Sequence, residues 1–219
     1  MTHIKICGVI SEDIAMGAAE AGADFIGLVF APSPRQVTPD QAARITATLK
    51  KNKTRAKSVG VFVNTAPQMV RQIAVQYNLD FVQLSGDESP VYCRMLSYPL
   101  IRVIRLSNSD TVEKIDKQII ETHMALFDRH FIIMLDTALP GKFGGTGEIF
   151  DWNLAKPVIK RCDVMIAGGL NPDNVGEVIK TLKPWGVDVS TGVETKGVKD
   201  MRKINKFIEA VREADGSQT

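Results

Sequence analysis

The chain has 219 residues and a mass of 24.0 kDa, with 44% hydrophobic residues, 24% charged residues and a formal net charge of +2. This length suits one domain, and the composition excludes a disordered or fibrous protein. The only basic run, residues 50–57, has no aromatic residues to stack on bases, so we expect no nucleic-acid partner. No export signal and no apolar stretch of ~20 residues is visible, so we expect a cytoplasmic protein with no membrane partner.

The three cysteines, Cys7, Cys93 and Cys162, are odd in number and show no Cys-X-X-Cys or Cys/His ligand spacing. Neither a disulfide framework nor a zinc site is therefore expected. A reducing compartment fits this cysteine usage.

In chain order, one unit recurs: a short β-branched or aromatic apolar run, a small loop, and an amphipathic helix pattern. The apolar runs predict strands at 3–7, 25–30, 58–63, 81–84, 101–105, 131–136, 163–167 and 187–189. Ser11, Thr38 and Asn171 are predicted helix N-caps, Gly22 a helix end, and residues 112–124 a further helix. Eight units without a long linker predict a single (β/α)₈ TIM barrel of parallel strands over residues 1–219; an open eight-stranded parallel sheet is the alternative.

In such a barrel, the active site lies on the loops after the carboxyl ends of the strands. Cys7 closes the first predicted strand, and its alternative role is that of a small buried hydrophobic residue. A nucleophilic cysteine usually needs a nearby histidine, but His3 lies ~13 Å away at ~3.3 Å per residue, toward the other end of the barrel. His123 and His130 flank the start of the sixth strand, so base catalysis by Cys7 is the hypothesis that remains. Lys5, a level deeper on the same strand face, is not expected to assist the thiol.

Asp136 ends the apolar sixth strand, where partial desolvation would raise its pKa and suit a general acid. Its alternative role is that of a helix or loop cap. The loop that follows, residues 137–148, is rich in glycine, which predicts a backbone shaped around a ligand or a movable lid.

Two adjacent glycine-containing loops predict a phosphate site, because glycines let backbone N–H groups approach an anion. Their residues are Gly168 and Gly169 after strand seven, and Ser190, Thr191 and Gly192 after strand eight, where a short helix is expected. Arg35, on a proline-stiffened loop after strand two, could clamp a carboxylate through two hydrogen bonds; a plain surface arginine is the alternative.

Taken in order, these segments resemble the phosphoribosylanthranilate isomerase family of tryptophan biosynthesis over nearly the whole chain. The matching segments are Lys5-Ile6-Cys7-Gly8, Gly22-Ala23-Asp24, Gly27-Leu28-Val29-Phe30, Ser33-Pro34-Arg35, Val59-Gly60-Val61-Phe62, Leu135-Asp136-Thr137, Gly168-Gly169-Leu170 and residues 186–194. The resemblance implies a cofactor-independent Amadori rearrangement of a phosphorylated small-molecule substrate. It also implies that Asp136 is the acid, Cys7 the base, Arg35 the carboxylate ligand, and residues 168–169 and 190–192 the phosphate ligands.

The chain departs from the family pattern at two places. Ser85 stands where the family commonly has histidine, which leaves any role of that histidine in doubt. The family's usual proline before Gly197 is also missing. Two alternative functions remain: another sugar-phosphate isomerase, epimerase or lyase, and a non-catalytic barrel that binds a phosphate ligand. The sequence does not distinguish a monomer from a homodimer. Because the loops after strands three and four show no second glycine cradle, a second aminoimidazole ribonucleotide substrate is not expected.

Overall fold

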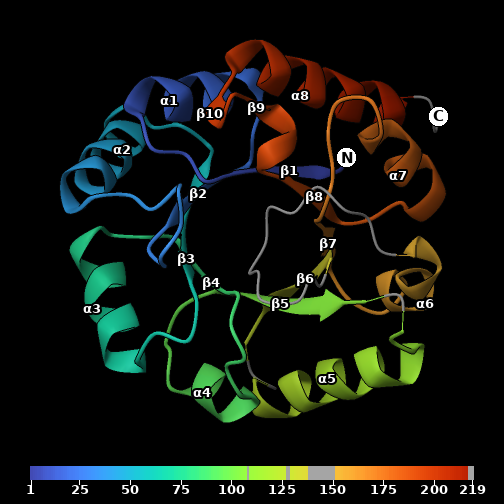
Figure 1. The fold of residues 1–219 in the computed structure, drawn as a ribbon. Helices are drawn as coiled ribbons and strands as arrows, with labels where there is room; N and C mark the ends of the chain where they lie inside the picture. The colour runs from blue at the N-terminus through green and yellow to red at the C-terminus, as the bar shows by residue number, and fades with distance from the viewer. Residues whose placement is uncertain (108, 127–128, 138–150, 217–219) are drawn as a thin grey trace.

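The computed structural model describes residues 1–107, 109–126, 129–137 and 151–216. Eight parallel strands follow one another around a closed barrel, and the last strand pairs with the first (Figure 1). The predicted TIM barrel is therefore confirmed, and the open sheet is excluded.

The strands are β1 (His3–Cys7), β2 (Phe25–Val29), β3 (Lys57–Phe62), β4 (Phe81–Leu84), β5 (Leu100–Leu106), β6 (Phe131–Thr137), β7 (Val164–Ile166) and β8 (Gly186–Val189), with a small antiparallel hairpin of β9 (Glu194–Thr195) and β10 (Val198–Lys199). The helices around them are α1 (Glu12–Ala21), α2 (Pro39–Lys51), α3 (Pro67–Gln76), α4 (Pro90–Arg94), α5 (Val112–Ala125), α6 (Lys156–Ile159), α7 (Val175–Leu182) and α8 (Met201–Gly216), with 3₁₀ turns η1 (Trp152–Leu154) and η2 (Thr191–Val193). All eight predicted strands are present, with ends that differ from the prediction by at most one residue.

The local signals for helix ends explain most of the observed boundaries. The hydroxyl of Ser11 accepts a hydrogen bond from the backbone N–H of Ile14, and Thr38 forms a capping box with Gln41. Gly22 ends α1, as predicted. The prediction for Asn171 is wrong, because its side chain instead accepts hydrogen bonds within a turn at residues 171–174, and α7 begins only at Val175.

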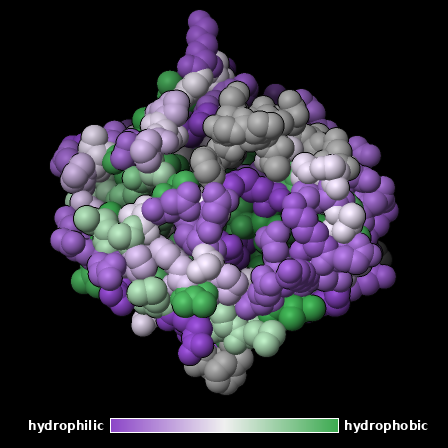
Figure 2. Space-filling view, turned by 60° about the horizontal axis from the view of Figure 1, so that its bottom comes forward, coloured by the Kyte–Doolittle hydropathy of each residue, from purple (hydrophilic) through white to green (hydrophobic). Residues whose placement is uncertain are grey.

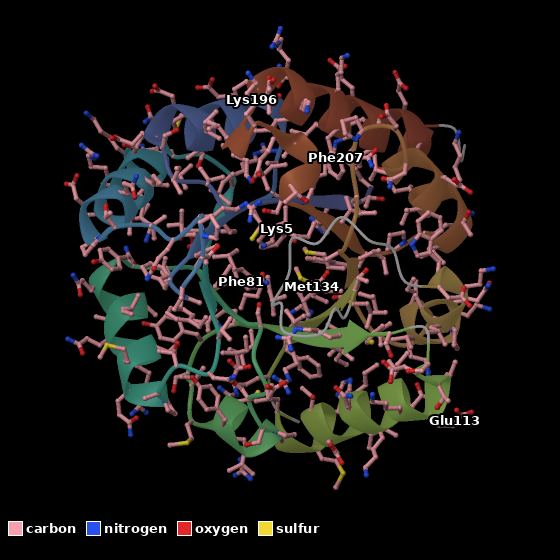
Figure 3. The ribbon with its side chains drawn as sticks, in the orientation of Figure 1. Lys5, Phe81, Glu113, Met134, Lys196 and Phe207 are labelled. Carbon is pink, nitrogen blue, oxygen red and sulfur yellow. The ribbon has the colours of Figure 1, made fainter. Side chains whose placement is uncertain are left out.

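Alternation along the strands separates two apolar layers. Ile4 and Ile6 of β1 point outward and pack in the large core between strands and helices, as does Phe207 of α8. A smaller cluster lies inside the barrel, and its members are Phe25, Val59, Ile101, Val103, Ile132, Met134, Met165 and Ala167. Figure 3 shows Lys5 pointing into the barrel interior, as Met134 does, while Glu113 points outward from α5. Lys5 is therefore a charged side chain in a largely apolar interior, where a buried charge needs a partner.

The face shown in Figure 2 is mostly hydrophilic, with hydrophobic residues scattered among hydrophilic ones. Met124 and Val75 are among the large hydrophobic residues that lie exposed on the outer helices. Within the described parts of the chain, no helix has the length and apolar character needed to cross a membrane.

Candidate active site

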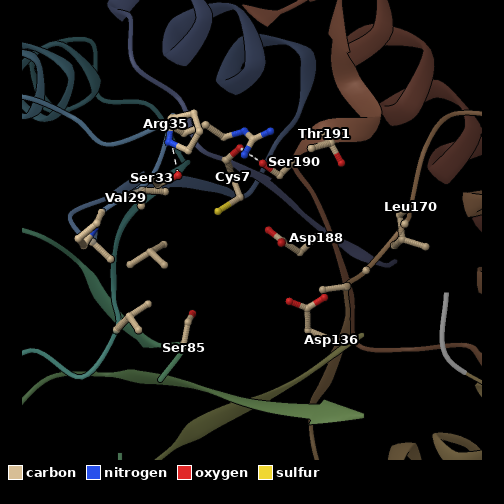
Figure 4. A pocket seen from close by; sticks show the side chains of 18 of the residues that line it. Cys7, Val29, Ser33, Arg35, Ser85, Asp136, Leu170, Asp188, Ser190 and Thr191 are labelled. Carbon is tan, nitrogen blue, oxygen red and sulfur yellow. Dashed lines mark hydrogen bonds between the residues drawn. The ribbon is translucent and has the colours of Figure 1, made fainter. Parts of the chain in front are cut away.

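A cavity of about 720 Å³ opens at the carboxyl ends of the strands. Its lining comprises Cys7, Val29, Ala31, Pro32, Ser33, Pro34, Arg35, Val61, Val63, Asn64, Ser85, Asp136, Ala167, Gly168, Gly169, Leu170, Asp188, Ser190 and Thr191. This set includes every site residue predicted from the sequence except Gly192. Figure 4 shows Cys7 and Asp136 on different walls, with Asp188 between them. One side of the cavity is apolar, and the rest carries groups able to donate or accept protons.

Cys7 ends β1 with its side chain inside the barrel, and only 8% of the residue is exposed. The chain then turns through Gly8, which has a φ of +77°, and a Cβ there would lie 2.5 Å from Cδ of Arg35. Glycine therefore lets Arg35 pack over the end of β1. The Ser190 hydroxyl donates a hydrogen bond to the carbonyl oxygen of Cys7, at 3.1 Å, which ties β1 to the loop after β8.

Lys5 contributes to the surroundings of the thiol, which corrects the expectation that it would not assist Cys7. Its side chain is fully buried, and Nζ donates a hydrogen bond to Oδ1 of Asp188 at 2.7 Å. Burial raises the pKa of the Cys7 thiol, while the positive charge of Lys5 opposes that increase. For Lys5, burial favours the neutral amine. The negative charges of Asp188 and of ionised Cys7, with the hydrogen bonds to both, together outweigh burial, so the pKa of Lys5 is raised and the side chain stays protonated.

Asp136 lies near the end of β6 and faces the same cavity. Its Oδ1 accepts a hydrogen bond from the backbone N–H of Thr137 at 2.8 Å. Burial, reinforced by repulsion from the Asp188 carboxylate, raises the pKa of Asp136 to about 6. A carboxyl group with this pKa can donate a proton near neutral pH, as a general acid must.

The two predicted glycine loops lie against each other on one side of the cavity. Gly168 has a φ of +85°, and a Cβ there would lie 2.3 Å from Oγ1 of Thr137, beside Asp136. Gly192 lies behind the lining, where a Cβ would come within 1.9 Å of the carbonyl oxygen of Leu170. Gly192 therefore keeps the two loops close together; it is partly exposed but is not among the residues that line the cavity. The short helix expected after Ser190 is the 3₁₀ turn η2.

Arg35 makes the bidentate contact expected of it, but with a carboxylate of the protein itself. Nε and Nη2 of Arg35 donate to Oε1 and Oε2 of Glu194, at 2.6 and 2.9 Å. Nζ of Lys199 also donates to Oε1 of Glu194, at 2.5 Å, and to the carbonyl oxygen of Ser190, at 3.1 Å. Glu194 thus joins the loop after β2 to the loop and hairpin after β8. Lys199 was not predicted as a site residue, because the hairpin that directs its side chain inward was not predicted.

The Glu194 carboxylate is expected to stabilise this side of the barrel in a pH-dependent way. Burial disfavours its charge, but hydrogen bonds from Arg35 and Lys199 outweigh burial and lower its pKa to about 2. A lowered folded-state pKa adds stability that is complete above the unfolded pKa of ~4.3 and is lost as the pH falls toward 2.

We predict that Glu194→Gln lowers the free energy of unfolding by about 2 kcal/mol at neutral pH. This loss should shrink between pH 4.5 and 2, as measured by urea unfolding across a pH series. Glu177→Gln, which changes an exposed residue of α7, is the matched control and should have little effect. A decrease in the free energy of unfolding that stays constant down to pH 2 would contradict the proposed role of the Glu194 charge.

Three further features of the predicted site are the glycine-rich loop, metal binding and the position of Ser85. The glycine-rich loop expected to cover the site falls almost entirely at residues 138–150, which lie outside the described residues. Across the described ranges, no group of three or more His, Cys, Asp or Glu side chains has a metal-binding arrangement. Ser85, at the position of the family's usual histidine, lines the cavity and accepts a hydrogen bond from Nε2 of Gln83 at 3.0 Å.

Comparison with known proteins identifies relatives of this barrel. Residues 4–210 match the family described as N-(5'-phosphoribosyl)anthranilate (PRA) isomerase. The chain is 43% identical to the N-(5'-phosphoribosyl)anthranilate isomerase of Dehalococcoides mccartyi, covering 100% of this chain and 99% of the relative. It is 42% identical to the enzyme of the same name from a Roseiflexus species, over 98% of this chain and 99% of the relative.

The solved structures agree with the sequence relatives. The crystal structure of phosphoribosyl anthranilate isomerase from Thermotoga maritima superposes with a TM-score of 0.81 at 36% identity, over 97% of this chain and 100% of that chain. Another, of the isomerase in complex with reduced 1-(o-carboxyphenylamino)-1-deoxyribulose 5-phosphate, has a TM-score of 0.78 at 35% identity, with the same coverage. The chain therefore belongs to the N-(5'-phosphoribosyl)anthranilate isomerase family.

Proposed function

We propose that this chain isomerises N-(5-phosphoribosyl)anthranilate to 1-(2-carboxyphenylamino)-1-deoxyribulose 5-phosphate in tryptophan biosynthesis, with Asp136 as general acid and Cys7 as general base. The observation that supports these roles is the position of the two groups on different walls of one cavity, beside two glycine loops. Membership of the isomerase family supports the reaction itself.

The chemistry divides between the two groups. Asp136 donates a proton to the ribose ring oxygen, the bond from that oxygen to C1 breaks, and the anilino nitrogen forms a protonated Schiff base with C1. The Cys7 thiolate then removes the proton from C2, and the released electron pair forms a C1–C2 double bond and neutralises the nitrogen. Movement of a proton from the C2 hydroxyl to C1 completes the ketone.

Substrate binding is assigned to the remaining walls of the cavity. The phosphate is held by Gly168, Gly169 and the loop at Ser190, Thr191 and Gly192, where backbone N–H groups and a glycine turn suit an anion. The aromatic ring fits the apolar side, which includes Val29 and Val61. Arg35 binds the anthranilate carboxylate; its contacts with Glu194 use Nε and one N–H of Nη2, so Nη1 and the second N–H of Nη2 remain as donors to the substrate.

Loss of anthranilate-type fluorescence tests the activity directly. Freshly prepared N-(5-phosphoribosyl)anthranilate mixed with purified protein is expected to lose fluorescence as product forms, at a rate proportional to protein concentration. Saturable binding without turnover would contradict the proposed enzyme and would support the non-catalytic phosphate-binding barrel.

The phosphate assignment predicts a selective effect of Gly192→Ala. The added methyl group would collide with the carbonyl oxygen of Leu170 and push the two loops apart, so we expect KM to rise at least about tenfold and the melting temperature to fall. Gly176→Ala in α7 is the control, because its Cβ would meet only ordinary contacts near 3.9 Å and alanine favours a helix. An unchanged KM for Gly192→Ala in steady-state kinetics would argue against phosphate binding at these loops.

A further inference from the structure

A buried ion pair separates the two groups assigned to acid–base chemistry. Lys5 of β1 and Asp188 of β8 are direct neighbours in the register of the barrel, and their Nζ and Oδ1 atoms are 2.7 Å apart. Lys5 is fully buried and Asp188 is 9% exposed, while Asp188 also lines the cavity. Burying two charges is costly, so a pair placed here without a function would be a poor way to stabilise the barrel.

The positive end of this pair faces Cys7. Gly27, the neighbour of Cys7 on β2, has no side chain, and a Cβ built there would lie 2.9 Å from Sγ of Cys7 and 3.1 Å from Nζ of Lys5. The sulfur and the ammonium group therefore border the same small space, which glycine leaves open between them. The positive charge of Lys5 is the largest of the effects that lower the pKa of the Cys7 thiol, while burial leaves that pKa raised overall.

The negative end faces Asp136. In Figure 4 the carboxyl groups of Asp188 and Asp136 both point into the cavity, and Asp188 lies on the side toward Cys7. After burial, the charge of Asp188 is the strongest influence that raises the pKa of Asp136. When two carboxyl groups face one cavity, the proton stays preferentially on the one whose cationic neighbours act more weakly, and Asp188 has the direct ion pair with Lys5.

We infer that Lys5 and Asp188 are positioning residues that act together: Lys5 increases the thiolate fraction of Cys7, and Asp188 increases the protonated fraction of Asp136. The inference rests on the roles proposed above for Cys7 and Asp136. Both required forms are minority forms at neutral pH, even with this assistance. With a pKa of about 6, which already includes the effect of Asp188, Asp136 is protonated in roughly one-tenth of molecules at pH 7. While the required form is in the minority, a change of one unit in the pKa of Cys7 or Asp136 in the favourable direction increases the fraction of that form about tenfold.

Other charged groups also face Cys7 and Asp136, and they do not reverse the effects of Lys5 and Asp188 on them. Lys199 of β10 adds a smaller effect that lowers the pKa of Cys7, and the Arg35 guanidinium also lies close enough to interact with the thiolate. Arg105, which pairs in register with Asp136, lowers the pKa of that carboxyl, as do the Thr137 N–H and Lys5 itself. Asp188 raises the pKa of Cys7, so the benefit to the thiol depends on Lys5 being closer to it.

Two substrate-free measurements test the two ends separately. The alkylation rate of Cys7 by iodoacetamide, followed by mass spectrometry of its peptide across pH, reports the thiolate. The ¹³C chemical shift of the Asp136 carboxyl, assigned by its absence in Asp136→Asn, reports the carboxylic acid. For Lys5→Met, we expect the alkylation midpoint to rise by at least about one pH unit and kcat/KM to fall at least about tenfold. For Asp188→Asn, we expect the Asp136 midpoint to move below its value of about 6.

Lys57→Met, at an exposed position where β3 begins, is the matched control and should leave both midpoints unchanged. An unmoved alkylation midpoint in folded Lys5→Met would overturn the inference. If Lys5→Met does not fold, Asp188→Asn decides, and an unmoved Asp136 midpoint would overturn it. Failure of the proposed catalytic roles would appear separately, as undiminished turnover by Cys7→Ser, while both substrate-free midpoints could still shift.

Discussion

Replacing Cys7 with serine is expected to lower kcat about 100- to 10,000-fold, which is the usual contribution of a positioned general base. Serine keeps the size of the side chain, but its hydroxyl group does not ionise near neutral pH, even beside Lys5. Because the substitution leaves the cavity walls intact, KM should change much less than kcat. Stopped-flow or steady-state fluorescence with N-(5-phosphoribosyl)anthranilate measures both constants.

Cys162→Ser is the matched control, since Cys162 is half-buried far along the chain and does not line the cavity. Its kcat should equal that of the unaltered protein. A Cys7→Ser variant with full kcat would remove Cys7 as the base and leave the thiolate without a role.

Replacing Asp136 with asparagine is expected to have an effect of similar size, again about 100- to 10,000-fold in kcat. Asparagine keeps the shape of the side chain and its place at the end of β6, but it has no acidic proton to give to the ring oxygen. Ring opening should then limit the rate. Steady-state kinetics under the conditions used for Cys7→Ser gives the comparison.

Asp173→Asn provides the control, because Asp173 lies exposed in the turn before α7 and away from the cavity lining. The double variant Cys7→Ser with Asp136→Asn adds a sharper test. If the two groups act on one reaction, the double variant should be little slower than the more impaired single variant. Residual activity of Asp136→Asn within about twofold of the unaltered protein would contradict its role as the acid.

Regular elements were predictable because their signals are local. The apolar runs at β1 and β4 have the observed bounds, and caps such as Ser11 and Thr38 depend only on residues three positions away. The start of α7 was not predictable in this way. Asn171 has the residue type of an N-cap, yet its side chain stabilises a turn that precedes the helix, and both uses look alike in sequence.

The predicted lining of the cavity follows from topology, since all strands of a parallel barrel end at the same face. What the sequence did not predict are pairings between residues distant in the chain. Lys5 meets Asp188 across 183 positions, and Arg35 meets Glu194 across 159. Such contacts depend on which side chains face inward and on how far each can reach, and for that reason Lys5 was wrongly set aside as too deep to assist Cys7.

In the proposed mechanism, Cys7 and Asp136 act from separate walls of the cavity on one sugar phosphate held by the glycine loops. A crystal structure of this chain with reduced 1-(o-carboxyphenylamino)-1-deoxyribulose 5-phosphate, the compound bound in a solved relative, tests it most directly. We predict the phosphate at residues 168–169 and 190–192, with the Cys7 sulfur and the Asp136 carboxyl both in contact with the sugar chain. A ligand that lies out of reach of either group, or a phosphate bound elsewhere, would contradict the mechanism.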